Sequence, residues 1–260
     1  MSDTGSSLQL KALNEFPLIQ PDDDLARILR QNLDDNAINL EDGDILVIAQ
    51  KIISKAEGRQ IALDSIQPRE QAHELAQLTG KDPRLVELIL EESSQVLRYR
   101  PGLIVVEHKL GFVCANAGID RSNVSLDDVS GDVSVLLLPK DPDHSAAMIR
   151  SALEEAFGVR LGVLIIDSHG RAWRNGTVGI SIGLSGMPGV VDLRGKPDLF
   201  GYQLRVTEIA AADELAAAAS LLMGQAAEGR PVVHVRGFPY KMREGSFQEL
   251  PRDREKDMFR

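Results

Sequence analysis

The stretch LGVLIIDSHGR, residues 161–171, decides the kind of fold that this chain of 260 residues can adopt. Its first six residues are apolar apart from one glycine, which predicts a strand over 161–166 that is buried on both faces. Asp167 follows directly. A carboxylate at the end of a buried strand is held rigidly yet reaches solvent, which suits it to hold a divalent cation against a phosphate group.

A second apolar segment runs into a similar polar cluster. The residues NAGIDRSN, 116–123, follow a short apolar strand and include Asp120 and Asn123. Together with Asp167 and Ser168 they offer oxygen ligands of the kind that Mg²⁺ and Mn²⁺ accept. The two clusters therefore predict a metal-dependent phosphate site, although an aspartate at such a position more commonly caps a helix or a turn.

Basic residues gather after another predicted strand, DILVIA, residues 44–49. The next ten residues, QKIISKAEGR, contain Lys51, Lys55 and Arg59. Lysine ammonium groups suit phosphate oxygens, but the spacing does not match the glycine-rich phosphate loop of common nucleotide-binding proteins. Taken alone, a solvated basic turn is the commoner interpretation of this segment.

Strands alternate with helices along the whole chain, which predicts a mixed α/β protein with mixed β-sheets flanked by helices. The predicted strands are 8–13, 44–49, 103–107, 112–115, 133–138, 161–166, 204–209 and 232–236, with a hairpin turn at 109–111. The predicted helices are 22–33, 68–78, one that begins after Asp82, 141–158 and 210–223.

No internal repeat or low-complexity linker marks a domain boundary. The length alone fits one large domain or two intertwined lobes. Seven glycines lie between residues 176 and 201. Such density is typical either of backbone that lies close to a ligand or another chain, or of a flexible loop.

Composition excludes several classes of protein. A net charge of −10 argues against a nucleic-acid partner, which needs a basic surface. The single cysteine, Cys114, excludes an intramolecular disulfide and a cysteine-rich zinc site. No apolar run approaches the roughly 18 residues that span a bilayer, and the N-terminus lacks the basic and apolar parts of a signal peptide. We expect a cytoplasmic protein whose partners are small molecules, not nucleic acids or membranes.

Taken together, the motifs resemble the coenzyme F420-0:L-glutamate ligases, GTP-dependent γ-glutamyl ligases of deazaflavin coenzyme biosynthesis. The resemblance spans roughly residues 8–240 and implies the fold of that family, with two chains intertwined as a homodimer. It implies that residues 8–240 form a single catalytic unit of one or two lobes, followed by a C-terminal tail, 241–260. It rests on FPLI (16–19), GDILVIAQK (43–51), SKAEGR (54–59), NAGID with SN (116–123), DSHGR (167–171), DLFG (198–201) and LLMGQ (221–225).

The resemblance also implies roles for individual residues. The residues implied to contact GTP are Phe16, Pro17, Leu18, Ile19, Gln50, Lys51, Lys55 and Asn123. Those implied to bind two Mg²⁺ or Mn²⁺ ions are Asp120, Asp167, Ser168 and Gln225, and a monovalent cation such as K⁺ is a further implied cofactor. Family members often carry glutamate where this chain has Gln225, and an amide binds a cation less strongly than a carboxylate. The implied catalytic residues are Asp120, Asp167 and Lys55.

The implied reaction is the attachment of L-glutamate to coenzyme F420-0. The carboxylate of its lactyl-phosphate arm would attack the γ-phosphate of GTP to give an acyl phosphate, and the amine of glutamate would displace phosphate to form an amide. A second round would add a γ-linked glutamate, with GDP and phosphate released each time. Two alternatives fit the same residues: a metal-dependent phosphatase or kinase of another small phosphorylated metabolite, and a non-catalytic nucleotide-binding protein.

Overall fold

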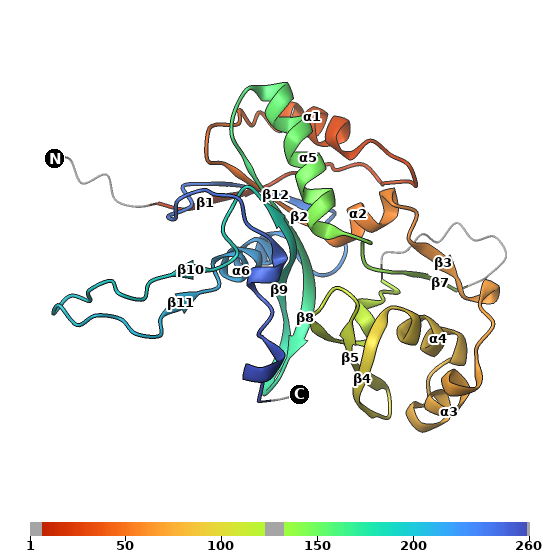
Figure 1. Cartoon of the computed structure of the whole chain (residues 1–260). Coiled ribbons are helices and arrows are strands. Elements are labelled where there is room, and N and C mark those ends of the chain that lie inside the picture. The colour runs from red at the N-terminus through yellow and green to blue at the C-terminus, as the bar shows by residue number, and fades with distance from the viewer. Residues whose placement is uncertain (1–6, 123–132, 259–260) are drawn as a thin grey trace, which may run out of the picture.

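A five-stranded sheet forms the centre of the fold in the computed structural model, which describes residues 7–122 and 133–258. The strand order is β1-β12-β2-β8-β9 (Figure 1). Along the chain these strands are β1 Gln9–Ala12, β2 Ile45–Ala49, β8 Gly162–Arg171, β9 Arg174–Ser185 and β12 Val232–Arg236. The pair β2 and β8 is parallel and the other neighbouring pairs are antiparallel. The predicted mixed α/β architecture is thus confirmed.

Helices cover both faces of this sheet (Figure 1). On one face lies α5, Pro142–Phe157, which also contacts α1, Leu25–Asp35. The other face is covered by α6, Ala211–Met223, whose apolar residues pack against β2, β8 and β12. Because both faces are covered, the first four residues of β2 are all buried, as its unbroken apolar sequence predicted. No helix in the described part of the chain is long and apolar enough to cross a membrane.

A smaller lobe packs beside the sheet. Its helices are α3 Glu70–Thr79 and α4 Pro83–Glu91, and its strands are β4 Ser93–Arg100, β5 Leu103–His108 and β6 Val113–Ala115 in one sheet, with β3 Gln60–Ala62 and β7 Ser134–Leu136 in another. The remaining elements are α2 Gln50–Ala56, β10 Val191–Asp192, β11 Glu208–Ile209 and four short 3₁₀ turns at Leu63–Ser65, Asn116–Gly118, Phe247–Glu249 and Arg254–Lys256.

Local signals fixed several helix ends as predicted. The carboxylates of Asp82 and Asp141 accept hydrogen bonds from backbone N–H groups in the first turns of α4 and α5. Gly158 ends α5 in the left-handed conformation, with φ of 70°. The hairpin of β5 and β6 was also predicted, with its turn at 109–111.

Three predicted elements need correction, and one strand was missed. β8 was expected to end at Ile166, but its pairing with β9 carries it to Arg171. The basic segment that starts at Gln50 is the helix α2, not a turn. The strand predicted at 204–209 is reduced to β11, and β4 was not predicted because its sequence, SSQVLRYR, is polar and mostly exposed. In each case the tertiary neighbours decide the backbone, not the local pattern.

Two glycines of the glycine-rich stretch lie in β9 and allow close packing within the chain. A Cβ atom at Gly179 would lie 2.5 Å from the carbonyl oxygen of Ala216 in α6. A Cβ atom at Gly183 would lie 2.4 Å from Cβ of Pro142 in α5. At these positions the glycines serve the chain's own helices, so neither a ligand, another chain nor a flexible loop explains them.

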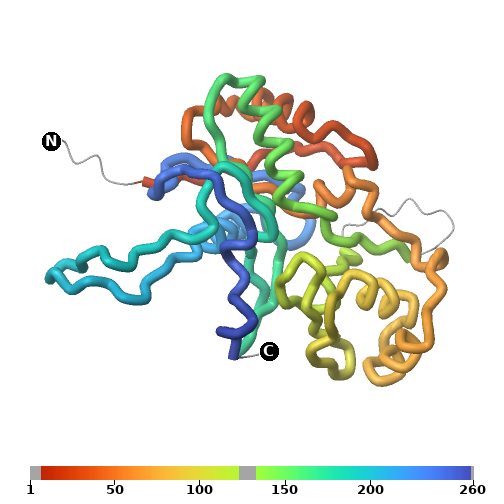
Figure 2. The backbone as a smooth tube through the Cα atoms, in the orientation of Figure 1, coloured from red at the N-terminus to blue at the C-terminus, as the bar shows by residue number. Residues whose placement is uncertain are grey.

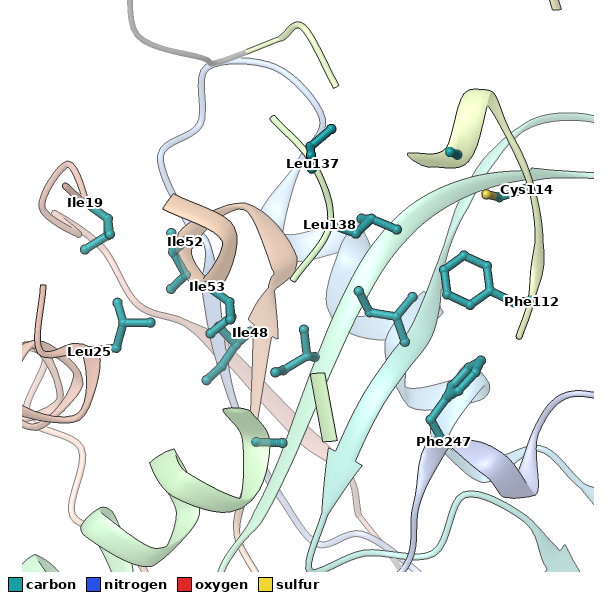
Figure 3. Close-up of a cluster of buried hydrophobic side chains, with 14 of the residues drawn as sticks. Ile19, Leu25, Ile48, Ile52, Ile53, Phe112, Cys114, Leu137, Leu138 and Phe247 are labelled. Atoms are coloured by element: carbon teal, nitrogen blue, oxygen red, sulfur yellow. The ribbon is translucent and has the colours of Figure 1, made fainter. Parts of the chain in front are cut away.

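One hydrophobic cluster joins the sheet to the smaller lobe (Figure 3). It contains Ile48 of β2 and Ile53 of α2, together with Phe112 and Cys114 from the lobe. Phe247, from the segment after residue 240, is also buried in it. The sheet and the lobe therefore share a single core.

A buried ion cluster ties β2 to β12. Asp44, which is 1% exposed, accepts hydrogen bonds from His234 Nε2 at 2.8 Å and from Arg236 Nη2 at 2.6 Å. Its other carboxylate oxygen accepts a bond from Arg236 Nε at 2.9 Å. Burial alone would raise the pKa of Asp44, but the bonds from Arg236 and His234 outweigh it and hold the pKa below its ordinary value.

We expect Asp44→Asn to destabilise the protein by about 2–4 kcal/mol at pH 7, because it leaves Arg236 without its buried partner. A carboxyl group whose pKa is lowered by folding stabilises the protein above its unfolded pKa, and that contribution is lost as the pH falls through the folded value. In urea unfolding, the free energies of unfolding of Asp44→Asn and of the unmodified protein should therefore differ less as the pH falls below about 3.9. The exposed substitution Asp34→Asn is the control, and a difference that does not change with pH would contradict the assignment.

Candidate active site

A cavity of about 700 Å³ opens where the carboxyl ends of β2 and β8 lie side by side. Its walls come from segments far apart in the sequence: 16–21, 49–60, Ser122, 166–168 and 220–231. The parallel pairing of Ala49 with Ile166 explains the meeting of two of these segments, because parallel strands end at the same edge of a sheet. A cavity of this size suits a nucleotide or a similar small molecule.

Most of the predicted site residues meet at this cavity. Ten of the twelve line it: Phe16, Pro17, Leu18, Ile19, Gln50, Lys51, Lys55, Asp167, Ser168 and Gln225. Of the other two, Asn123 lies outside the described residues, and Asp120 lies directly behind Lys51 and Ser122, which both line the cavity. The sequence motifs thus converge in space although they are scattered along the chain.

Asp120 forms an ion pair with Lys51. The Nζ atom of Lys51 lies 2.6 Å from Oδ2 of Asp120, and Ser122 donates to Oδ1 from both its hydroxyl and its backbone N–H. Burial would raise the pKa of Asp120, but the bonds from Lys51 and Ser122 prevail and hold the pKa below its ordinary value. Asp120 is therefore a carboxylate whose charge is already balanced within the chain.

The helix α2 places Lys51 and Lys55 one turn apart, so that both side chains reach the cavity. Burial, and then the charge of Lys51, lower the pKa of Lys55. Gln50, at the start of the same helix, accepts a hydrogen bond from the Ser54 hydroxyl at 2.8 Å, while its buried Nε2 has no partner among the described residues. Two lysines thus line one cavity, with a buried, unpartnered amide nitrogen of Gln50 close by among the described residues, an arrangement that suits an anionic ligand.

Asp167 lies within β8, beside an irregularity in the pairing of β8 with β9 between Ile165 and Ile166. Its side chain is 12% exposed, and Oδ2 lies 2.8 Å from Nε2 of His169. Among the described residues, no lysine or arginine lies within ion-pair distance of this carboxylate. A mostly buried carboxylate without a fixed cation is suited to bind one from solution.

The donor atoms around Asp167 fit a cation that prefers oxygen ligands. Asp167, Ser168 and Gln225 all line the cavity and supply carboxylate, hydroxyl and amide oxygens. No group of three His, Cys, Asp or Glu residues that could hold a metal is found in the described residues. A cation here would need further ligands from substrate or water, and Asp120 would have to leave Lys51 in order to join them.

The loop after α6 supplies cavity residues that the sequence did not reveal. Glu228 and Arg230 both line the cavity. They arrive there because β12 is antiparallel to β2, so that its first residues lie beside the end of β2, where Ala49 N–H donates to the carbonyl oxygen of Pro231 at 2.8 Å. Their position directly after the LLMGQ motif is the one signal that could have pointed to them.

Comparison with known proteins gives a consistent match over the chain. The model of the F420-0:gamma-glutamyl ligase family matches residues 14–237, a range that includes every segment lining the cavity. The coenzyme F420:L-glutamate ligase of Methanothermobacter thermautotrophicus is 47% identical over 255 residues, which are 97% of this chain and 99% of that protein. The proteins of the same name from Methanocaldococcus jannaschii and Archaeoglobus fulgidus are 47% and 45% identical, over 85% and 94% of this chain and 86% and 93% of their own lengths.

The ion pair between Lys51 and Asp120 generates a prediction about proton binding. Lys51→Met removes the charge and the hydrogen bond but keeps a side chain of similar length. Since Lys51 no longer stabilises the ionised carboxylate, we expect the pKa of Asp120 to rise above its value in the unmodified protein. A titration of the Asp120 carboxyl carbon by NMR measures the change, with the exposed substitution Lys140→Met as the control. An unchanged pKa in Lys51→Met would show that Lys51 does not govern this carboxylate.

Proposed function

The chain belongs to the F420-0:gamma-glutamyl ligase family, and on that premise we propose that it is the ligase that adds L-glutamate to coenzyme F420-0, with GTP as co-substrate. The observation that carries the proposal is 47% identity to a coenzyme F420:L-glutamate ligase over 97% of this chain. The cavity supports it, because it collects the implied site residues from segments between 16 and 231. That spread also supports treating residues 8–240 as a single catalytic unit.

GTP binds in the cavity against the residues 16–19 and the helix α2. The segment 16–19 offers apolar surface, including Leu18, which is 85% exposed. Lys51, Lys55 and the free amide of Gln50 face the phosphates. A net charge of −10 would repel a triphosphate at long range, but the field of the whole protein is screened beyond about 8 Å, so these local cations decide binding.

Asp167, Ser168 and Gln225 would hold a divalent cation, Mg²⁺ or Mn²⁺, and Asp120 would be a further ligand if its ion pair with Lys51 opened. Such a cation neutralises charge on the reacting phosphate groups. The family resemblance implies two divalent ions and a monovalent cation such as K⁺. The free carboxylate of Asp167 supports the first ion most directly, because its charge has no other partner than His169 among the described residues.

The proposed reaction requires the protein to position its substrates and to neutralise charge, and it requires no nucleophile from the protein. The substrate carboxylate attacks the γ-phosphate of GTP to form an acyl phosphate, and the amine of L-glutamate then displaces phosphate to form the amide. Lys55 stabilises the charge that develops on the transferred phosphoryl group. Cys114 takes no part, because burial raises the pKa of its thiol to about 12 and it stays protonated.

A reaction mixture of the protein with F420-0, GTP, Mn²⁺ and L-glutamate tests the function, with the products resolved by chromatography and mass analysis. We expect each turnover to add one glutamyl residue and to release GDP and phosphate. Asp167→Asn should lower turnover by at least about 100-fold with the fold intact, because it removes the carboxylate charge. Asp34→Asn is the control. Phosphate release that does not depend on glutamate would indicate a phosphatase or kinase, and binding of GTP with no change of mass would indicate a non-catalytic protein.

The arm formed by residues 191–209 supports assembly as a homodimer. It projects from the body of the protein as a long hairpin with β10 and β11 at its base (Figure 2). Its exposed residues include Leu199 at 98%, Phe200 at 95% and Val206 at 85%. Apolar side chains on a projecting arm are stabilised when they pack on another surface, and a second copy of this chain supplies one.

We expect the double substitution Leu199→Asp with Phe200→Asp to shift the protein from dimer to monomer, because it places two charges where apolar contacts would form. Light scattering after size-exclusion chromatography gives the mass directly. Leu78→Asp, at another exposed apolar position, on α3, is the control. A dimer that survives the double substitution would exclude the arm as the interface.

A further inference from the structure

Asp167 has a close neighbour within the DSHGR motif, His169, to which no role has been assigned. His169 lies two positions further along β8, and residues at i and i+2 of a strand project from the same face. Its Nε2 lies 2.8 Å from Oδ2 of Asp167, and its side chain is 8% exposed. A carboxylate can only accept a hydrogen bond, so Nε2 of His169 carries the hydrogen and donates it.

The ring of His169 is held by aromatic packing against the smaller lobe. Phe112 lies against it with ring centroids 5.3 Å apart and an angle of 47° between the planes. Phe112 in turn stacks on His108, at 5.2 Å and 6°, and meets the edge of Phe247 at 5.6 Å and 81°. Phe112 and Phe247 are seen together in Figure 3. The imidazole of His169 is therefore mostly buried, with Phe112 packed against it and Asp167 hydrogen-bonded to it.

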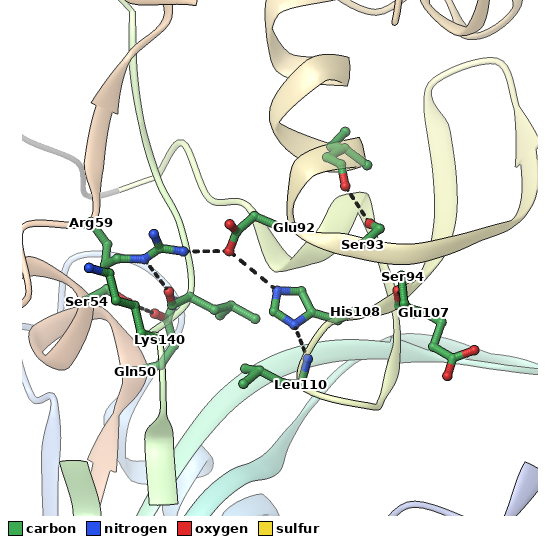
Figure 4. A network of polar contacts seen from close by, with 12 residues as sticks. Gln50, Ser54, Arg59, Glu92, Ser93, Ser94, Glu107, His108, Leu110 and Lys140 are labelled. Atoms are coloured by element: carbon green, nitrogen blue, oxygen red, sulfur yellow. Dashed lines mark hydrogen bonds and ion pairs between the residues drawn. The ribbon is translucent and has the colours of Figure 1, made fainter. Parts of the chain in front are cut away.

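His108, at the end of the ring series away from His169, is held by a hydrogen bond of its own. Nδ1 of His108 accepts a hydrogen bond from the backbone N–H of Leu110 at 3.0 Å, and Glu92 lies 3.9 Å from its Nε2 (Figure 4). Glu92 is itself paired with Arg59 at 2.5 Å. Burial, together with the nearby charge of Arg59, lowers the pKa of His108 to about 4, so it is a neutral ring at pH 7. The series thus ends beside a charged pair formed by Glu92 of the lobe and Arg59, which lies between α2 and β3.

Apart from His169, no described residue donates a hydrogen bond to the Asp167 carboxylate. His169 donates to Oδ2. Cys114 is close enough that the charge of Asp167 helps to raise the pKa of its thiol, after burial, which contributes most. The Asp167 carboxylate therefore has one oxygen engaged by His169, while Oδ1 accepts no bond within the described chain.

We infer that His169 is a positioning residue: held by Phe112, it fixes the carboxylate of Asp167 through Oδ2 and so leaves Oδ1 for a cation in the cavity. Partners that orient a ligating carboxylate commonly change metal affinity or activity by about 10–100-fold. The inference rests on the proposed role of Asp167 in holding a divalent cation. It assigns to the smaller lobe a part in the chemistry, because the lobe provides the rings that keep His169 in place.

Two substitutions separate the hydrogen bond from the packing. His169→Met has a similar volume but no donor, whereas His169→Gln carries an amide nitrogen that reaches about as far as Nε2. Binding of Mn²⁺, followed by electron paramagnetic resonance with GTP present and F420-0 absent, gives a readout apart from activity. Steady-state kinetics then give kcat and the KM for glutamate. The unmodified protein, Asp167→Asn and the exposed substitution His73→Met complete the set.

We expect His169→Met to weaken Mn²⁺ binding and to lower kcat, each by about tenfold or more, with the KM for glutamate and the melting temperature little changed. His169→Gln should recover most of both losses, and His73→Met should match the unmodified protein. Unchanged Mn²⁺ binding in His169→Met would overturn the inference, and so would equal losses in both variants with a lowered melting temperature, because packing alone would then be at work. Unchanged Mn²⁺ binding in Asp167→Asn would instead overturn the proposed metal site itself.

Discussion

The parallel pairing of β2 with β8 is the constraint on which the rest of the structure depends. It sets Ala49 opposite Ile166, so that the residues following each meet at one edge of the sheet. From one strand comes α2 with its lysines, and from the other comes Asp167. A parallel pair must be buried on both faces, which explains why both strands are apolar and why α5 and α6 lie on opposite sides. The cavity is a consequence of this geometry.

Although the protein carries a net charge of −10, two lysines line its cavity. Lys51 and Lys55 stand together on α2, and Asp120 forms an ion pair with Lys51. At the neighbouring strand end, Asp167 keeps a carboxylate without a lysine or arginine partner among the described residues. Lysine ammonium groups suit phosphate oxygens, and a carboxylate suits a divalent cation. The pair of Lys51 and Asp120 therefore keeps a cation and a carboxylate together beside the cavity.

The smaller lobe is coupled to the site through packing rather than through the backbone of the sheet. His108, Phe112, His169 and Phe247 form a continuous series of ring contacts from the lobe to β8. Closely packed rings transmit a shift of one to the next, because the interior has no space to absorb it. In this way β5, β6 and the segment around Phe247 affect the orientation of His169, which belongs to β8.

The sequence by itself determined many of the local elements and pointed to residues that line one cavity. Unbroken apolar runs marked β2 and β8, the caps at Asp82, Asp141 and Gly158 marked helix ends, and the motifs named ten residues that line the cavity. These signals are local or are carried by short motifs. Where such local signals are missing, the predictions are wrong. β4 has no apolar pattern, and the continuation of β8 to Arg171 depends on β9 beside it.

Only the tertiary structure decided how those residues are paired. Lys51 and Ser122 are 71 positions apart, and no periodicity in the sequence indicates that they share Asp120. The ring of Phe112 against His169, and the loop of Glu228 and Arg230 in the cavity, likewise arise from the way strands are ordered in the sheet. Local pattern specifies which face of an element is buried, whereas strand order and packing specify which distant residue lies opposite it.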